Sequence, residues 1–181
     1  MRDVSKVKVY MDDKGFVHVD NAIIISKNFS GNEKFDKDGQ IVNAKGERNF
    51  RIALNDEAGQ FLSNLGLNVK VTPPRDGDGE PLIALQIKVS YKFNDSRRPV
   101  IKKYTKKKFD IMDESNVHEI DNNYIEDADL VFRPNPWSVR GASGVSAYLR
   151  KLNFMIAEDD FDAKWDSMLE DEPSDNFMEE V

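Results

Sequence analysis

The stretch NFRIALNDEAGQFLSNLGLNVKVT (residues 49–72) gives the clearest indication of the fold. Apolar residues alternate over Asn49–Leu54, which predicts a strand with one buried face. Asn55 is a favourable N-cap for the helix that follows, and Gly66 is a favourable residue for ending it. Asn68–Thr72 alternates again. The stretch therefore predicts a strand, a helix and a second strand in direct succession.

Short alternating segments rich in β-branched and aromatic residues continue on both sides of this unit. They predict further strands at Val7–Met11, Ala22–Ser26, Leu82–Phe93, Val100–Phe109, Asp129–Arg133 and Val145–Ile156. Polar, glycine- and proline-rich segments separate them, and they predict loops at Ser30–Gly46 (a long loop or an extended hairpin), Pro73–Pro81 and Arg133–Gly144. A second, shorter helix is expected in Glu114–Ile120. Five to seven strands with one convincing helix predict a mainly β protein with an OB-fold-like antiparallel barrel.

The charge of the chain changes sign near its C-terminus. The whole chain has 26 Lys and Arg against 33 Asp and Glu, a net charge of −7. Residues 158–181 contain eleven of the acidic residues and one Lys, which leaves 25 basic and 22 acidic residues in 1–157. We therefore expect a mildly basic domain at 1–157 and an acidic, largely flexible tail at 158–181. Most such charge runs are solvated segments that aid solubility, and that alternative stays open.

The sequence lacks the residues that several classes of enzyme and metal site require. The chain has no Cys and two His, and neither His has a second His at metal-ligand spacing. No phosphate-binding loop, dinucleotide fingerprint or nucleophile elbow occurs. We therefore expect a non-enzyme with no metal and no cofactor. The N-terminus has no apolar signal region and no segment approaches the ~20 apolar residues of a membrane span, so a cytoplasmic location is expected.

Three clusters of basic residues stand out, and two of them also contain aromatic rings. Cations and flat rings are the two kinds of group that single-stranded nucleic acid requires. Arg97–Phe109 has seven Lys or Arg with Tyr104 among them, although lysines also protect an edge strand from aggregation. A second cluster consists of Arg48, Arg51, Lys70 and Arg75, and a third joins Arg133 and Arg140 to Trp137. Trp137 suits either a base or a loop anchored on the core.

The order of several short motifs resembles a family of bacteriophage single-stranded DNA-binding proteins. The motifs are Gly46-x-Arg48-Asn49-Phe50, Gly66-x-Asn68-Val69-Lys70, Pro74-Arg75-Asp76 with Pro81, and Arg133-Pro134 with Trp137, Gly141, Gly144 and Ala147-Tyr148-Leu149. Glu47 stands where a second basic residue is expected. The resemblance covers roughly residues 46–165 and implies an OB-fold with an acidic tail that recruits replication partners and competes with DNA. It also implies a phage-encoded protein acting in the bacterial host cell.

These observations lead to one main hypothesis and two alternatives. The main one is a protein that coats single-stranded DNA (ssDNA) without strong sequence preference during phage replication or recombination. The predicted contacts are Lys102, Lys103, Tyr104, Lys106, Lys107, Arg133, Trp137 and Arg140, with Arg48, Phe50, Lys70, Arg75 and Tyr91 in second rank. The predicted partner-binding and autoinhibitory tail residues are Asp171, Glu172, Asp175, Phe177, Glu179 and Glu180, and the expected partners are a polymerase, a helicase or primase, or a recombinase.

The alternatives are an adaptor that does not touch DNA and a metal-dependent nuclease or its inhibitor. The segment Val145–Ile156 suits a barrel interior or the interface of a homodimer.

Overall fold

The computed structural model describes residues 3–75 and 77–157. The predicted tail, with Asp171, Glu172, Asp175, Phe177, Glu179 and Glu180, lies outside the described residues. The predicted boundary between the domain and the tail, after residue 157, stays a prediction.

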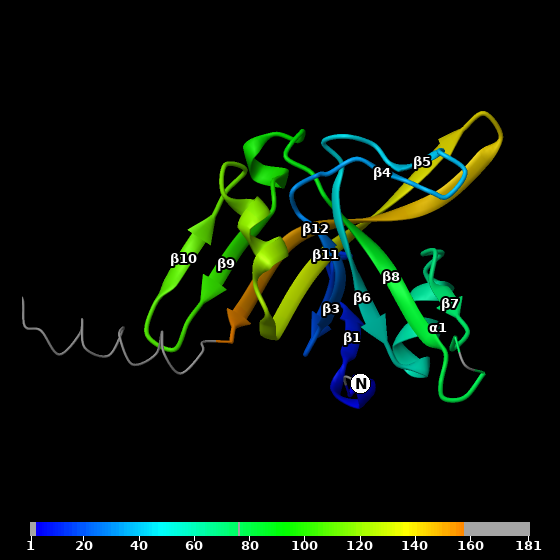
Figure 1. Ribbon diagram of the computed structural model, residues 1–181, viewed down its shortest axis with the longest axis horizontal. Helices are drawn as coiled ribbons and strands as arrows, with labels where there is room; N and C mark the ends of the chain where they lie inside the picture. Colours follow the sequence, from blue (N-terminus) through cyan, green and yellow to red (C-terminus); the bar gives the residue numbers. More distant parts are fainter. Residues whose placement is uncertain (1–2, 76, 158–181) are drawn as a thin grey trace, which may run out of the picture.

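The chain is mainly β (Figure 1). Six strands form a ring with five positions, because β2 and β3 together act as one bent strand. The ring consists of the bent pair β2 (Val17–Asp20) and β3 (Ile23–Asn28), then β6 (Arg48–Leu54), β8 (Leu82–Val89), β12 (Ala142–Ile156) and β11 (Ile125–Val139). β3 pairs with β6, β6 with β8, β12 with β11, and β11 with β2, all antiparallel. β8 meets β12 in parallel at Lys88 and Tyr148. This order is that of a five-stranded Greek-key barrel, so the predicted OB-fold-like barrel is confirmed, with a parallel pairing in an otherwise antiparallel ring.

The ring closes at a corner between β2 and β3. Asn21 adopts φ 56°, a left-handed conformation that Asn tolerates better than most residues. The backbone N–H of Asn21 donates to the Asp129 carboxylate at 2.9 Å, and the N–H of Ala22 donates to the Ala128 carbonyl at 2.7 Å. The corner is therefore attached to β11, which lets one bent strand reach both edges of the sheet.

The strand–helix–strand unit forms as predicted. Helix α1 (Asp56–Asn64) is capped by Asn55, whose side chain accepts from the backbone N–H of Ala58 at 2.8 Å. It ends before Gly66, at φ 88°, and β7 (Lys70–Thr72) then pairs with β8. β1 (Lys8–Met11) pairs with β2; the short helix η1 (Val4–Lys6) precedes β1, and η2 (Asp95–Arg97) follows β8.

The expected loop or extended hairpin at residues 30–46 is a hairpin of β4 (Lys34–Phe35) and β5 (Ile41–Asn43). The prediction of a loop over Arg133–Gly144 was wrong. These residues are the outer halves of β11 and β12, which project from the barrel as a two-stranded ribbon. Beyond Phe132, β11 pairs with β12 but no longer with β2. An open strand edge tolerates proline, which explains why Pro134 and Pro136 do not break this strand.

Two further predictions need correction. Val100–Phe109 was predicted as one strand but contains a turn, so that β9 (Val100–Tyr104) pairs with β10 (Phe109–Met112). The backbone N–H of Thr105 donates to the Lys108 carbonyl at 2.9 Å and closes this turn. The short helix expected at Glu114–Ile120 is a 3₁₀ helix, η3 (Val117–Asn122).

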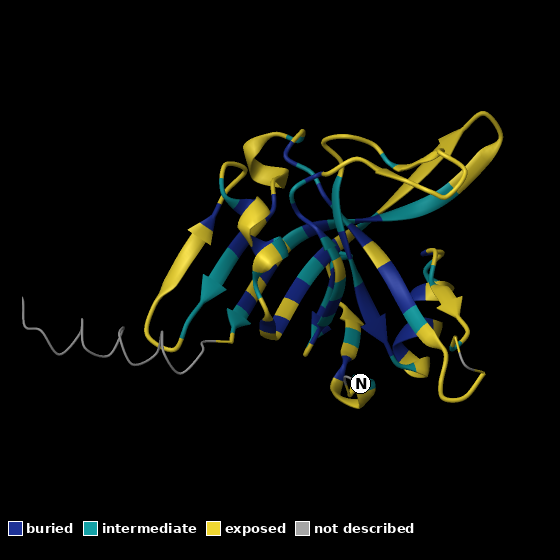
Figure 2. Cartoon of the chain, viewed as in Figure 1, coloured by how far each residue is buried: buried dark blue, intermediate teal, exposed yellow. Residues whose placement is uncertain are grey.

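The core fills the inside of the ring (Figure 2). Its largest fully buried side chains come from five of the six ring strands (all but β3), from α1, β9 and η3, and from Phe29 just after β3: Phe29, Phe50, Phe132, Phe154, Ile52, Leu62, Ile87, Ile101, Ile120, Leu149, Leu152 and Val17. The alternate side chains of the same strands face outward, and those of β6, β8 and β12 form the surface described next.

Candidate nucleic-acid interface

The outward side chains of three neighbouring strands are brought together by the strand register. Arg51 of β6 pairs with Gln86 of β8, and Lys88, two residues further along β8, pairs with Tyr148 of β12. Residues two apart share a face of a strand, so these side chains project from the same side of the sheet. The Lys88 ammonium lies 5.8 Å from the centre of the Tyr148 ring.

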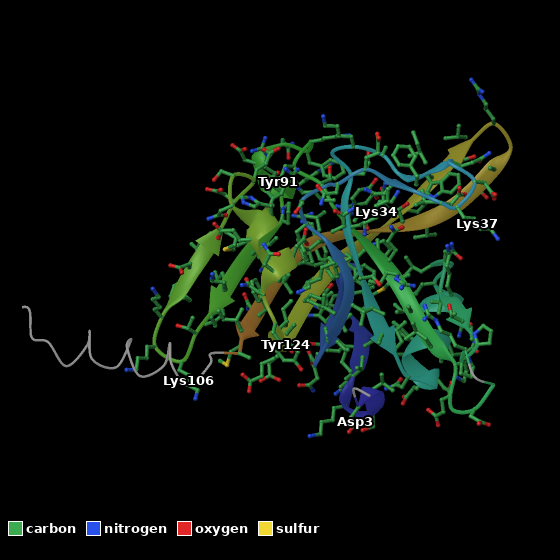
Figure 3. The ribbon with its side chains drawn as sticks, in the orientation of Figure 1. Asp3, Lys34, Lys37, Tyr91, Lys106 and Tyr124 are labelled. Carbon is green, nitrogen blue, oxygen red and sulfur yellow. The ribbon has the colours of Figure 1, made fainter. Side chains whose placement is uncertain are left out.

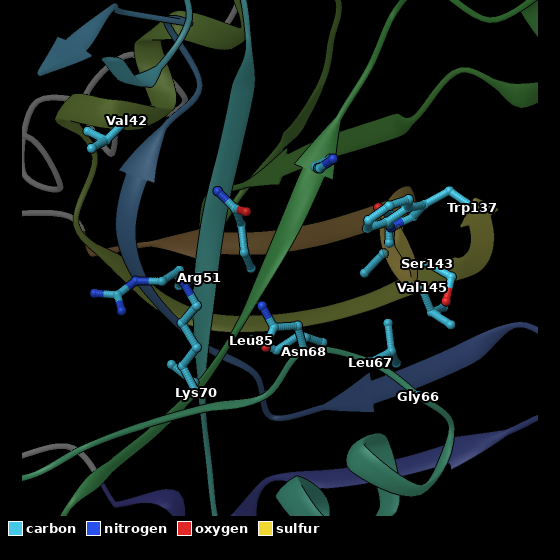
Figure 4. Close-up of a pocket in the computed structure, with 16 residues that line it drawn as sticks. Val42, Arg51, Gly66, Leu67, Asn68, Lys70, Leu85, Trp137, Ser143 and Val145 are labelled. Atoms are coloured by element: carbon cyan, nitrogen blue, oxygen red, sulfur yellow. The ribbon is translucent and has the colours of Figure 1, made fainter. Parts of the chain in front are cut away.

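A groove of about 680 Å³ lies on this face (Figure 4). Arg51, Lys70 and Lys88 line it, and none of its lining residues is a carboxylate. Val42 of the β4–β5 hairpin and Trp137 of the β11–β12 ribbon belong to the same lining. The groove is therefore basic, with one hairpin on each side.

Trp137 lies directly over Gly144 on the partner strand. The two residues are paired in the β11–β12 register, and a Cβ built on Gly144 would lie 2.8 Å from Cζ2 of the indole. A side chain at position 144 would therefore displace the ring. Trp137 keeps 41% of its surface exposed, so the indole offers an open face at the edge of the groove.

The basic surface continues along β12 beyond the groove. Tyr148 is paired with Arg133, and its ring meets the Phe93 ring edge-on at 5.3 Å between centroids. A small hollow beside these rings is lined by Arg97, Arg133 and Arg150 as well. Two aromatic positions, Trp137 and Tyr148, thus lie on one face with cations around both.

Of the predicted contact residues, Lys70 and Trp137 line the groove and Arg133 lines the adjoining hollow. Arg140 lies at the exposed tip of the β11–β12 ribbon with φ 49°. Arg75 is exposed in the β7–β8 loop and is not among the residues that line the groove.

Two second-rank predictions occupy structural positions instead, and a third, Arg48, is fixed by contacts to the barrel. Phe50 has no exposed surface and stacks on Phe29 at 5.1 Å, so its prediction as a base contact was wrong. Tyr91 is 8% exposed, and burial raises its pKa to about 12 although the Arg48 guanidinium acts in the opposite direction. Arg48 lies 5.4 Å above the Tyr91 ring, donates to the Phe29 carbonyl at 3.1 Å and is 3.8 Å from Glu114. Phe50 and Tyr91 therefore support the barrel, and Arg48 is held against it.

The lysine-rich segment lies away from the groove. Lys102, Lys103 and Tyr104 belong to β9, while Lys106 and Lys107 lie in the turn before β10. Figure 3 shows Lys106 at one end of the long axis of the molecule and Lys37, in the turn of the β4–β5 hairpin, towards the other end. The predicted contacts are consequently divided between two separate surfaces.

Sequence reasoning missed several residues of the groove and the hollow, among them Gln86, Lys88, Phe93 and Arg150. It included Arg97 in the lysine-rich cluster but did not predict it as a contact. For Gln86 and Lys88 a signal was present, because they are the polar residues of the alternating strand LIALQIKV and must face away from the core. For Phe93, Arg97 and Arg150 only the three-dimensional packing against Tyr148 reveals the site.

Within residues 3–75 and 77–157, no group of three or more His, Cys, Asp or Glu side chains is arranged to hold a metal ion. Across the same residues, no helix is long and apolar enough to cross a membrane.

In an OB-fold barrel, oligonucleotides and oligosaccharides bind on the face of the second and third strands, between the loop joining strands one and two and the loop joining strands four and five. Here these positions are β6 and β8, the β4–β5 hairpin and the tip of the β11–β12 ribbon. The basic groove occupies this face, so the fold and the site together define a barrel of the oligonucleotide-binding class.

Comparison with known proteins identifies the family. The model of the putative phage ssDNA-binding domain matches residues 6–176, and the chain belongs to this family. No curated protein sequence matches the chain.

Solved structures similar to this chain include the single-stranded DNA-binding protein from bacteriophage Enc34. Its complex with ssDNA is 10% identical, with 86% of this chain and 98% of that chain covered and a TM-score of 0.47. A C-terminal truncation of the same phage protein is 12% identical, with coverages of 81% and 88% and a TM-score of 0.45.

Proposed function

We propose that this protein binds ssDNA in the groove on the β6–β8–β12 face, between the β4–β5 hairpin and the β11–β12 ribbon. One observation supports this most: the groove joins Arg51, Lys70 and Lys88 to the open indole of Trp137, and no carboxylate lines it. Membership of the phage ssDNA-binding family agrees with the proposal.

The groove residues contact two different parts of the nucleic acid, its phosphate backbone and its bases. The three cations contact phosphates, which gives affinity without sequence information. Trp137 stacks on an unpaired base, and any base offers a flat face to it. Tyr148 and Phe93 provide a second aromatic position, with Arg97, Arg133 and Arg150 beside it for the next phosphates. Such a surface binds single strands with weak sequence preference.

In the infected cell, the protein coats ssDNA in the cytoplasm during phage replication or recombination and carries out no catalysis. The acidic end of the chain, with Asp171, Glu172, Asp175, Phe177, Glu179 and Glu180, recruits other replication proteins and competes with DNA for the basic groove. Removing Ser174–Val181 is then expected to raise DNA affinity and to abolish recruitment. An affinity that stays constant or falls would contradict the competition.

A titration with a dT oligomer of ~30 nucleotides tests the binding itself. The chain has two tryptophans, Trp137 and Trp165, so a Trp165→Phe variant reports on Trp137 alone. We expect quenching of Trp137 fluorescence and an affinity that falls steeply between low and moderate salt, since phosphate contacts release counterions. No binding at low salt, with residues 158–181 removed, would refute DNA binding and favour the adaptor.

A further inference from the structure

The β9–β10 hairpin bears an aromatic and basic surface of its own, distinct from the groove. Lys102 pairs with Ile111 and Tyr104 with Phe109, so these four side chains lie on one face of the hairpin. We call them the hairpin platform. The Tyr104 and Phe109 rings are stacked at 5.5 Å, and the Lys102 ammonium lies 5.7 Å from the centre of the Phe109 ring.

The platform exposes apolar groups that a solubilising role does not explain. Phe109 is 53% exposed and Ile111 is 62% exposed, on a strand that pairs only with β9 among the described residues. Lysines on an edge strand protect it from aggregation, but exposed Phe and Ile act against that protection. An apolar patch rimmed by charge marks a binding surface.

The charge of the hairpin indicates an acidic occupant. Residues 102–110 contain five Lys and one Asp, a formal charge of +4. The hairpin lies at the opposite end of the long axis from the tip of the β11–β12 ribbon (Figure 1), so an occupant here leaves the groove open.

The chain leaves the barrel beside this hairpin. β12 runs parallel to β9, with Lys151 opposite Val100 and Met155 opposite Tyr104. The N–H of Ala157 donates to the Tyr124 carbonyl at 3.0 Å and fixes the exit point. The last described residue, Ala157, therefore lies next to the end of β9. The segment that follows it is tethered close to the platform, which gives it a high effective concentration there.

The sequence of that segment complements the platform in both charge and apolar groups. EDDFDAKWDSMLE (residues 158–170) contains six acidic residues and one Lys, a formal charge of −5. Phe161, Trp165 and Leu169 recur every fourth residue, a spacing that places them on one face of a helix.

We propose that residues 158–170 dock in cis on the hairpin platform, with Phe161 and Trp165 against Phe109 and Ile111 and the carboxylates among the lysines. Docking holds residues 158–170 away from the DNA groove and leaves residues 171–181 available for the partner binding and the competition with DNA proposed above. The lysine-rich hairpin is then a receptor for the protein's own tail, whether or not the groove binds ssDNA.

Trp165 fluorescence tests this docking in the full chain without DNA. In a Trp137→Phe background Trp165 is the only tryptophan, and we expect blue-shifted emission and weak acrylamide quenching relative to a peptide of residues 158–170. Lys106→Glu with Lys108→Glu reduces the formal charge of residues 102–110 from +4 to zero and should shift both readouts to the values of the peptide. Phe109→Ser should do the same without changing charge. Lys34→Glu with Lys37→Glu, on the separate β4–β5 hairpin, is the matched control and should leave Trp165 unchanged.

Circular dichroism and thermal unfolding establish that each variant is folded. Emission of Trp165 identical to the peptide in the parent protein would overturn the proposal, as would indifference to both hairpin variants. A blue shift that weakens on dilution would assign the occupant to a second copy and refute docking in cis. Hairpin variants that weaken dT binding without altering Trp165 would identify the hairpin as a DNA surface instead.

Discussion

Replacing Trp137 by Ala should weaken DNA binding in a protein that stays folded. The indole is 41% exposed and lies over Gly144, outside the core, so its removal should cost about 1–2 kcal/mol of unfolding free energy. A domain of this size is stable by about 5–15 kcal/mol, and the variant should stay folded. Loss of one base stack costs about 1–3 kcal/mol of binding free energy. At about 1.4 kcal/mol for each factor of ten, the Kd for dT should rise about 5- to 140-fold.

The assay is fluorescence anisotropy of a labelled dT oligomer of ~30 nucleotides at fixed salt, with urea unfolding of the same samples. Trp137→Phe should retain part of the affinity because a smaller ring still stacks. Val139→Ala, an exposed change on the same strand at 60% exposure, should leave Kd unchanged. A Trp137→Ala variant that is folded and binds with the parent affinity would refute base stacking at this residue.

Four further changes follow from the described contacts. Gly144→Ala should weaken dT binding several-fold with little change in Tm, because its new Cβ would displace the Trp137 ring, and an unchanged Kd would mean that the ring position is immaterial. Lys88→Ala should reduce the slope of log K against log salt by about 0.7, whereas Lys14→Ala should not. Tyr91→Phe should raise the unfolding free energy by about 1 kcal/mol, since the buried hydroxyl has no hydrogen-bond partner among the described residues; a loss of stability in urea unfolding would contradict this. Phe50→Ala should lower it by about 3–5 kcal/mol, and a neutral effect would contradict its core position.

The sequence predicted the parts of the fold in which local signals and tertiary packing agree. Asn55 and Gly66 mark the ends of α1 because capping is a property of a few adjacent residues. The ribbon of β11 and β12 was missed because Pro134 and Pro136 normally interrupt strands. That rule fails where a strand edge is open, and an open edge is a property of the assembled sheet.

Among the predicted contacts, Lys70 and Trp137 line the groove and Arg133 lines the hollow, so part of the candidate site was predictable from basic and aromatic residues alone. Phe50 and Tyr91 were misassigned because an aromatic ring next to a basic residue has the same pattern in the core as on a surface. The lysine-rich segment has the strongest linear signal for nucleic acid, yet β9 is attached to the far part of β12, at the other end of the molecule. The two surfaces can be told apart only once the strand order is known.

Photo-crosslinking can show directly whether ssDNA bases contact the groove. A dT oligomer containing 5-iododeoxyuridine, irradiated on the full chain and mapped by peptide mass spectrometry, reports which aromatic residues contact bases. We expect crosslinks at Trp137 and Tyr148 that are lost in 1 M salt. Crosslinks confined to Tyr104 and Phe109 would contradict it and move the DNA-binding surface to the β9–β10 hairpin.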